Sequence, residues 1–148
     1  MIKKSEILKT NYIESLLKEK GYTTLREVIP IECEKWERPY RVDLIFYKNP
    51  DEAVAVEFKD ASLRSGGKIA EAYLQIEKYR KLKYKDLKII EWCIFPSFYT
   101  PDEETHGNGE SMLIVHDFVE YFFRKLNISY MWEHKKELYI NNVCRGAL

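Results

Sequence analysis

Residues 40–59 read YRVDLIFYKNPDEAVAVEFK, and this stretch decides the fold. Segments 40–47 and 53–59 are short and rich in β-branched and aromatic residues, which is typical of strands. Between them, residues 49–52 (NPDE) combine a proline that is preset for a turn with side chains that can bond the local backbone. The stretch therefore predicts a β-hairpin.

The sequence on both sides of this hairpin predicts an α/β fold. A helix is expected from residue 5 to about residue 20, because apolar residues recur on one side and Gly21 stands where a helix ends. The pattern is extended over residues 23–36. After the hairpin we expect a helix over about 68–84 and a mostly apolar strand over 87–95, so the element order is α-β-β-β-α-β.

The C-terminal third predicts further elements on the same domain. A polar loop over 96–110 precedes an aromatic-rich helix over about 111–126, and residues 130–140 are expected to form one strand or a small hairpin. A chain of 148 residues can bury a core of its own. We therefore expect a single domain with a core over about 5–95 and a C-terminal elaboration over 96–148.

The composition limits the classes of function. The 24 Lys and Arg residues balance the 24 Asp and Glu residues, so a nucleic-acid site has to be a local patch rather than a general basic surface. No apolar run approaches the ~20 residues that cross a bilayer, and charges interrupt the N-terminal segment, so we expect a cytoplasmic protein without membrane contact. Cys33, Cys93 and Cys144 fit neither a disulfide set nor a metal knuckle, and we expect small buried hydrophobes.

Two acidic residues and a lysine in the hairpin have the pattern of a metal site. Asp43 lies inside an apolar strand, where an ionised carboxylate is costly without a partner. Glu57 and Lys59 point to one face of the next strand, because side chains alternate along a strand. If the strands pair, Asp43 and Glu57 converge, and a divalent cation such as Mg²⁺ or Mn²⁺ would offset their repulsion.

This pattern resembles a known family. Asp43, thirteen residues and then Glu57-Phe58-Lys59 resemble the D-xn-ExK motif of the PD-(D/E)xK phosphodiesterase superfamily, and the element order is similar to its restriction-endonuclease-like core. The resemblance implies Mg²⁺-dependent cleavage of DNA. It implies that Asp43, Glu57 and the carbonyl of Phe58 hold the metal and that Lys59 lies beside the attacking water.

A second motif is similar to one subgroup of that superfamily. Gln75 and Tyr79, on the helix after the lysine, resemble the QxxxY motif of RecB-type nuclease domains, and Gln75 is the only glutamine in the chain. Their spacing places them on one helix face, where they would position the DNA strand or Lys59. A core tyrosine and a solvated amide are the alternative. The four cysteines that hold an iron–sulfur cluster in some relatives are missing, so no cluster is expected.

Further residues are candidates for the same site. In the superfamily a glutamate on the first helix often completes the site, and Glu14 is our choice, with Glu6 as its competitor. Arg64, Lys68 and Lys78 could bind backbone phosphates, or they could only solubilise the helix. A Holliday-junction-resolvase-like endonuclease, which would be a homodimer, and a non-catalytic nucleic-acid-binding domain remain as alternatives.

Overall fold

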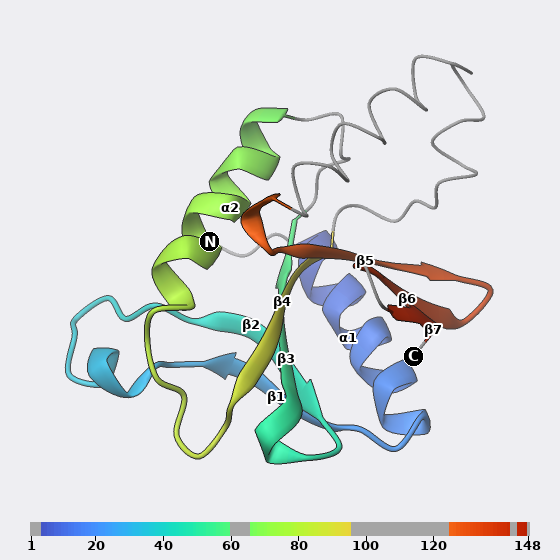
Figure 1. Cartoon of the computed structure of the whole chain (residues 1–148), viewed down its shortest axis with the longest axis horizontal. Coiled ribbons are helices and arrows are strands. Elements are labelled where there is room, and N and C mark those ends of the chain that lie inside the picture. The colour runs from blue at the N-terminus through green and yellow to red at the C-terminus, as the bar shows by residue number, and fades with distance from the viewer. Residues whose placement is uncertain (1–3, 60–65, 96–124, 143–144, 148) are drawn as a thin grey trace.

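The computed structural model of the protein describes residues 4–59, 66–95, 125–142 and 145–147, which form one mixed sheet with helices on both faces (Figure 1). Seven strands lie in the sheet in chain order, from β1 at one edge to β7 at the other. The predicted α/β class is therefore confirmed. The elements are α1 (Lys4–Glu19), β1 (Thr23–Val28), the 3-10 turn η1 (Ile31–Cys33), β2 (Val42–Tyr47), the 3-10 turn η2 (Pro50–Glu52), β3 (Ala53–Phe58), α2 (Gly66–Tyr79), β4 (Ile89–Phe95), β5 (Ser129–His134), β6 (Glu137–Asn142) and β7 (Arg145–Ala147).

The predicted hairpin is present as strands β2 and β3. These strands pair antiparallel, with Leu44 opposite Val56. The turn forms as the sequence predicts, because the Asn49 side chain accepts a hydrogen bond of 3.0 Å from the backbone N–H of Asp51, with Pro50 as the first residue of η2. This turn and the pairing together fix the register of the two strands.

Parallel pairing begins where α2 carries the chain from β3 to β4. β3 pairs parallel with β4, and β4 pairs parallel with β5, whereas the β1–β2, β5–β6 and β6–β7 pairs are antiparallel. Strands β5 and β6 form the hairpin that was one of two expectations for residues 130–140, and β7 was not predicted. The expected loop over 96–110 and most of the expected helix over 111–126 lie outside the described residues.

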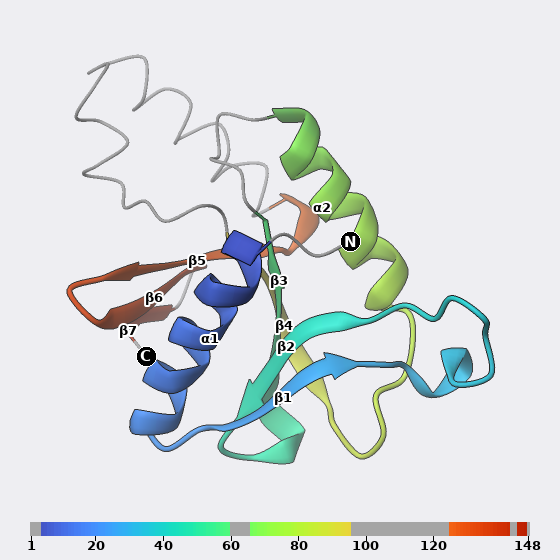
Figure 2. The ribbon, with the colours of Figure 1, turned by 180° about the vertical axis from the view of Figure 1, so that it is seen from behind.

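The sheet lies between α1 on one face and α2 on the other (Figure 2), and an apolar layer on each face forms the core. On the face toward α1, Ile13 and Leu17 pack against alternate sheet residues such as Val56. On the face toward α2, Ile76 packs against the other set, which includes Ala55. Because both faces of β3 are covered, all six of its residues are buried.

Two predicted boundaries were wrong, because both segments end earlier than the sequence suggests. The extended segment expected over 23–36 leaves the sheet after Val28, and the N–H of Ile31 instead donates to the Lys83 carbonyl at 2.9 Å. The second helix ends at Tyr79 rather than near residue 84. Gly21, by contrast, ends α1 as expected, with a φ of 89°.

Two smaller expectations can also be compared with the structure. Cys33 and Cys93 are buried free thiols, as expected, and Cys144 lies outside the described residues. Within the described segments, neither helix combines the length and the apolar character that crossing a membrane requires.

Candidate active site

Asp43 and Glu57 meet where the β2–β3 pairing ends. Continuing the register by one residue from the Leu44–Val56 pair places Asp43 across from Glu57, and both side chains lie on the face toward α2. The backbone N–H of Phe58 donates to Asp43 Oδ2 at 2.8 Å, and the N–H of Asp43 donates to Glu57 Oε1 at 3.4 Å. Each carboxyl group is thus held by the backbone of the opposite strand.

Glu57 is buried and Asp43 is partly buried, and the pKa of each carboxyl group is raised. Burial raises the pKa of Asp43 to about 6. Burial and the charge of Asp43 raise the pKa of Glu57 well above its ordinary value. A hydrogen bond between the two groups lowers the pKa of Asp43 and raises that of Glu57, so this contact favours the ionised form of Asp43 and the neutral form of Glu57. None of the ion pairs among the described residues involves either group.

Lys59 follows directly at the end of β3 and is held at both backbone atoms. Its N–H donates to the Phe95 carbonyl at 2.9 Å, and its own carbonyl accepts a hydrogen bond of 3.1 Å from Lys9 Nζ. The positive charge of Lys59 lowers the pKa of both Asp43 and Glu57, while its side chain stays partly exposed. A fixed backbone therefore places a solvent-accessible ammonium group next to two buried carboxyl groups.

Lys9 is a residue of this region that the sequence analysis missed. Its side chain is only 2% exposed, and its ammonium lies 5.9 Å from the centre of the Phe95 ring. The available signal was its position one turn before Ile13, on the buried face of α1. A lysine on an apolar helix face is costly to bury, so its contact with the Lys59 carbonyl explains how it is accommodated.

Gln75 and Tyr79 lie at the same place, on the helix that covers the carboxyl groups. The pKa of the Tyr79 hydroxyl is raised to about 12, first by burial and then by the negative charges of Glu57 and Asp43, whereas a hydrogen bond with the Gln75 side chain lowers it. Gln75 Oε1 is buried and has no hydrogen-bond partner. Gln75 and Tyr79 therefore both face the two carboxyl groups, and the side-chain oxygen of Gln75 remains without a hydrogen-bond partner.

A shallow groove opens beside these residues. It has a volume of about 320 Å³ and lies between the end of β3 and the outer face of α2. Lys78, one of the predicted phosphate contacts, lines it and is exposed. Arg64 and the side chain of Lys68 lie outside the described residues. The groove residues are Lys59, Glu71, Leu74, Gln75 and Lys78.

Glu14 makes its contacts with β1 rather than with the two buried carboxyl groups. Glu14 Oε2 accepts a hydrogen bond of 2.7 Å from the Thr24 hydroxyl, and Oε1 lies 3.4 Å from the Arg26 guanidinium and 4.0 Å from Lys18 Nζ. The side chain of Glu6, its competitor, lies outside the described residues.

A different acidic residue, Glu27, acts on Asp43. It stands on β1 between the Arg26–Leu44 and Val28–Val42 pairs, and its negative charge helps to raise the pKa of Asp43. Glu27 has a φ of 52°, a conformation that is uncommon for a residue other than glycine. The sequence carried no signal for this conformation.

The chemistry of the donor set limits which metal ion could bind. In the described part of the chain, no three His, Cys, Asp or Glu side chains gather as a metal-binding group. Asp43 and Glu57 offer two carboxylates, and backbone carbonyls follow them at the end of β3. Mg²⁺ and Mn²⁺ accept such oxygen ligands, and Mg²⁺ commonly keeps several waters and binds substrate phosphates besides one or two carboxylates.

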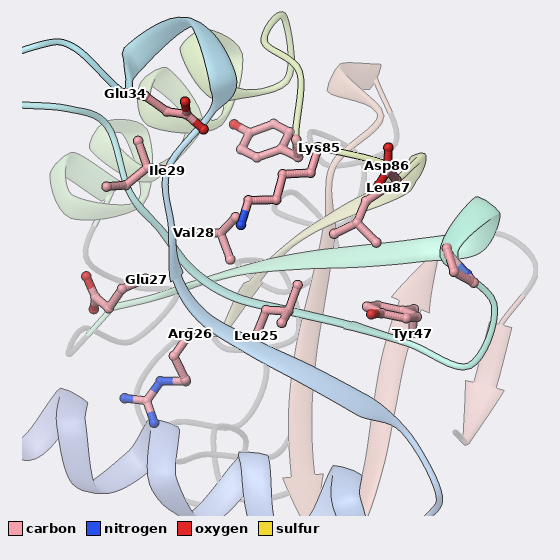
Figure 3. Close-up of a pocket in the computed structure, with 12 residues that line it drawn as sticks. Leu25, Arg26, Glu27, Val28, Ile29, Glu34, Tyr47, Lys85, Asp86 and Leu87 are labelled. Carbon is pink, nitrogen blue, oxygen red and sulfur yellow. The ribbon is translucent and has the colours of Figure 1, made fainter.

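A larger pocket of about 610 Å³ lies elsewhere, between β1 and the turn before β4 (Figure 3). Its lining is mostly apolar and includes Leu25, Val28 and Leu87, while the side chain of Arg26 extends from it toward α1. Neither Asp43 nor Glu57 lines this pocket. Neither residue lines the smaller groove either, but Lys59, whose charge acts on both carboxyl groups, does, so the smaller groove is the candidate site.

Comparison of the chain with protein-family models, with curated proteins and with solved structures finds no match.

Proposed function

We propose that the protein is a cytoplasmic Mg²⁺- or Mn²⁺-dependent nuclease with a restriction-endonuclease-like fold, in which Asp43, Glu57 and Lys59 form the catalytic centre. The observation that carries the proposal is the buried pair of carboxyl groups with a lysine beside it at the ends of two neighbouring strands. Strained and perturbed groups of this kind are frequent at functional sites. The helix, three strands, helix and strand of residues 4–95 support the same fold.

The residues present fit a hard divalent cation. Asp43 and Glu57, with the Phe58 carbonyl, would hold the metal. A cation bound there would lower the pKa of Asp43 and Glu57 and would displace protons from them. Without a cation, the burial of both groups only destabilises the fold. When bound, the metal would supply an acidified water and would stabilise negative charge on the phosphate.

The chain's own residues have separate parts in this proposal. Lys59 orients the attacking water and offsets the charge that develops on the phosphate, because its ammonium is accessible and its backbone is fixed on both sides. Gln75 offers its unused buried acceptor to Lys59 or to the substrate. Tyr79 holds the amide of Gln75 in place through its hydroxyl. This grouping supports a RecB-type arrangement.

DNA is the substrate that we propose, because the groove beside Lys59 and Gln75 carries the cation of Lys78 and is open to solvent. A local patch of this kind agrees with a chain whose net charge is zero. A phosphate in the groove would lie between Lys59 and Lys78, within reach of the carboxylates. Such contacts bind the backbone and do not select a base sequence.

The direct test is cleavage of labelled DNA by the purified chain. Single-stranded, duplex, flap and four-way-junction DNA are incubated with Mg²⁺, Mn²⁺ or EDTA, and the products are separated by length. We expect cleavage with either metal and none with EDTA. Cleavage of the four-way junction alone, by a homodimer, would identify a resolvase-like endonuclease. A chain that neither cuts any substrate nor binds Mn²⁺ in calorimetry is not this enzyme, and the non-catalytic alternative would then hold.

A further inference from the structure

Three aromatic rings lead from the protein surface to the candidate active site. Trp36 lies in the loop between η1 and β2, and its ring packs edge-on against Tyr40, with 5.4 Å between the ring centres. The Tyr40 ring lies 5.2 Å from the ring of Tyr79. The negative charges of Asp43 and Glu57 in turn help to raise the pKa of the Tyr79 hydroxyl. Direct ring contacts thus connect Trp36 to Tyr79, whose hydroxyl lies close enough to the two carboxyl groups for their charges to affect its pKa.

Trp36 leaves a large part of its surface in water. It is 47% exposed, and it is the only aromatic residue among the large hydrophobic side chains that are exposed in the described part of the chain. Tyr40 is partly buried and Tyr79 is buried. Two inner rings therefore support the indole from one side, and its outer surface remains accessible.

The base of this loop is fixed to the body of the protein. The N–H of Trp36 donates to the Cys33 carbonyl at 3.0 Å. The Glu32 carboxylate accepts from the N–H of Lys83 at 3.0 and 3.2 Å, and the N–H of Ile31 donates to the Lys83 carbonyl. The loop lies next to the C-terminal end of α2 (Figure 1). Because this end of the loop is anchored, little ordering is left for a ligand to induce.

Several cationic residues are close to Trp36 in the sequence. Lys35, Arg38 and Arg41 are exposed and lie within five residues of Trp36, and none takes part in the ion pairs of the described residues. Glu34 and Glu37 in the same loop reduce the net positive charge, so the loop is not a general anion-binding surface. An accessible aromatic ring among cations is the combination that binds single strands, where bases stack and phosphates pair.

We propose that Trp36 is a stacking platform for an unpaired base of the nucleic-acid strand whose phosphate reaches Asp43 and Glu57. The proposal rests on the function proposed above and narrows its substrate class to single-stranded or locally unpaired nucleic acid. Bases inside a duplex are already stacked on both sides, so they offer no free face to an indole. Tyr40, the ring that supports Trp36, also contacts Tyr79, so a base stacked on Trp36 would lie two ring contacts away from Tyr79.

The test measures binding of the full chain to uncut strands in EDTA. A short fluorescent single strand is titrated by anisotropy, and a covalently closed circular duplex serves as the competitor. We expect Trp36→Ala to weaken binding of the single strand by roughly 5- to 100-fold, the range for loss of one stacking contact. Trp36→Phe should keep most of the affinity, and both variants should melt near the wild-type temperature because the side chain is exposed.

Ile31→Ala is the matched control. Ile31 lies in the neighbouring turn η1 and is 45% exposed, close to the 47% of Trp36, but it carries no aromatic ring. The substitution therefore removes an exposed apolar side chain that cannot stack on a base. We expect the control to bind single strands as the wild type does. The proposal is wrong if the wild type binds no single strand, if Trp36→Ala binds like the wild type, or if it loses affinity for single strand and duplex equally. An Ile31→Ala defect as large as that of Trp36→Ala would also overturn it.

This experiment separates the platform from the nuclease. Binding in EDTA requires no metal ion and no cleavage. If Trp36→Ala weakens single-strand binding but the wild type never cuts DNA, the protein is a nucleic-acid-binding domain in which Trp36 still stacks on a base. Metal-dependent cleavage without any Trp36 effect would leave a nuclease whose substrate is not held by this ring.

Discussion

The α1–β1 contact and the ends of β2 and β3 both place carboxyl groups against the sheet, on opposite faces, but they satisfy them differently. On the α1 face, Glu14 receives a hydroxyl hydrogen bond from Thr24 and lies beside the Arg26 guanidinium. On the α2 face, Asp43 and Glu57 accept hydrogen bonds from backbone N–H groups and interact with each other, and the pKa of each is raised. Glu14 therefore has a cationic partner within the protein, whereas no ion pair among the described residues involves Asp43 or Glu57.

This difference separates an acidic residue that stabilises the fold through its own partners from two acidic residues that we propose as ligands of a metal ion. A partly exposed ion pair such as that of Glu14 stabilises a fold by a small amount. Two buried carboxyl groups without a cation destabilise it, so packing does not explain why they are there. Natural proteins often carry such unfavourable groups where function requires them. The comparison therefore points to the α2 face as the functional one.

Replacing either buried carboxyl group should give the largest effect on activity. We expect Asp43→Ala and Glu57→Ala each to abolish cleavage, because either loss removes half of the carboxylate ligands. Without metal, their melting temperatures should stay level or rise, since the repulsion and the burial of one charge are removed. The measurements are cleavage with Mn²⁺ and thermal unfolding in EDTA.

Glu14→Gln is the matched control for this prediction. It removes one carboxylate charge from the α1 face, so cleavage should be retained and stability should fall by about 1 kcal/mol or less. The opposite pattern, with activity lost in Glu14→Gln and retained in Asp43→Ala or Glu57→Ala, would reverse the comparison. Glu14 would then be the residue that completes the site.

Removing the neighbouring ammonium should lower the rate by orders of magnitude while the metal still binds. Lys59 is expected to act on the water and on the transition state rather than on the bound cation, so Lys59→Ala changes the rate constant more than metal affinity. Single-turnover cleavage and calorimetry with Mn²⁺ measure the two quantities. A variant with wild-type rate would exclude Lys59 from the mechanism.

The main features of this region follow from local sequence signals. The turn at residues 49–52 forms through its own side chain and proline, and the two strands it joins have strong β-branched character. Once these strands pair, Asp43 and Glu57 stand opposite each other because they lie at equal distances from the turn. Gln75 and Tyr79 share a helix face for an equally local reason, which is their spacing.

The remaining features depend on packing between distant segments. Lys9 reaches the Lys59 carbonyl only because α1 crosses the end of β3, fifty positions further along the chain. Glu27 acts on Asp43 through the β1–β2 register and an unusual backbone conformation. The contact of the Trp36 ring with Tyr40, and of Tyr40 with Tyr79, depends on the path of the loop between η1 and β2. No periodicity encodes such contacts.

The stability of the metal-free protein should respond to pH in an unusual direction. The pKa of Asp43 is raised from its ordinary 3.8 to about 6, so the folded state takes up a proton before the unfolded chain does. The free-energy cost of holding ionised Asp43 in the folded state is therefore present above pH 6, and it disappears as the pH falls toward 4. We expect unfolding in EDTA to require on the order of 3 kcal/mol more at the acidic end from this group.

Denaturant unfolding in EDTA between pH 7 and pH 4 measures this contribution. The matched control is Asp43→Asn, which cannot titrate and should lose the gain. Glu14→Gln should keep it. Saturating Mn²⁺ should remove the gain in the wild type as well, since the cation favours the ionised groups. Equal pH profiles for the wild type and Asp43→Asn would show that Asp43 is not the strained group.

The smallest expected effects concern the residues that only position others. Gln75→Ala removes an unpartnered amide oxygen and one hydrogen bond to the Tyr79 hydroxyl, so its free energy of unfolding should fall by about 1 kcal/mol or less. Tyr79→Phe keeps the ring that packs on Tyr40 and deletes the hydroxyl that bonds Gln75. We expect each variant to cut DNA roughly tenfold more slowly, which corresponds to about 1.4 kcal/mol in transition-state stabilisation.

The readouts are single-turnover cleavage and melting temperature. Lys78→Ala is the control, and it should instead weaken DNA binding in a salt-dependent way. If both variants cut at the wild-type rate, the QxxxY match is coincidental, because a positioning contact must act on the rate even where stability is unchanged. The centre would then consist of Asp43, Glu57 and Lys59 alone, as in a resolvase-like or restriction-type endonuclease.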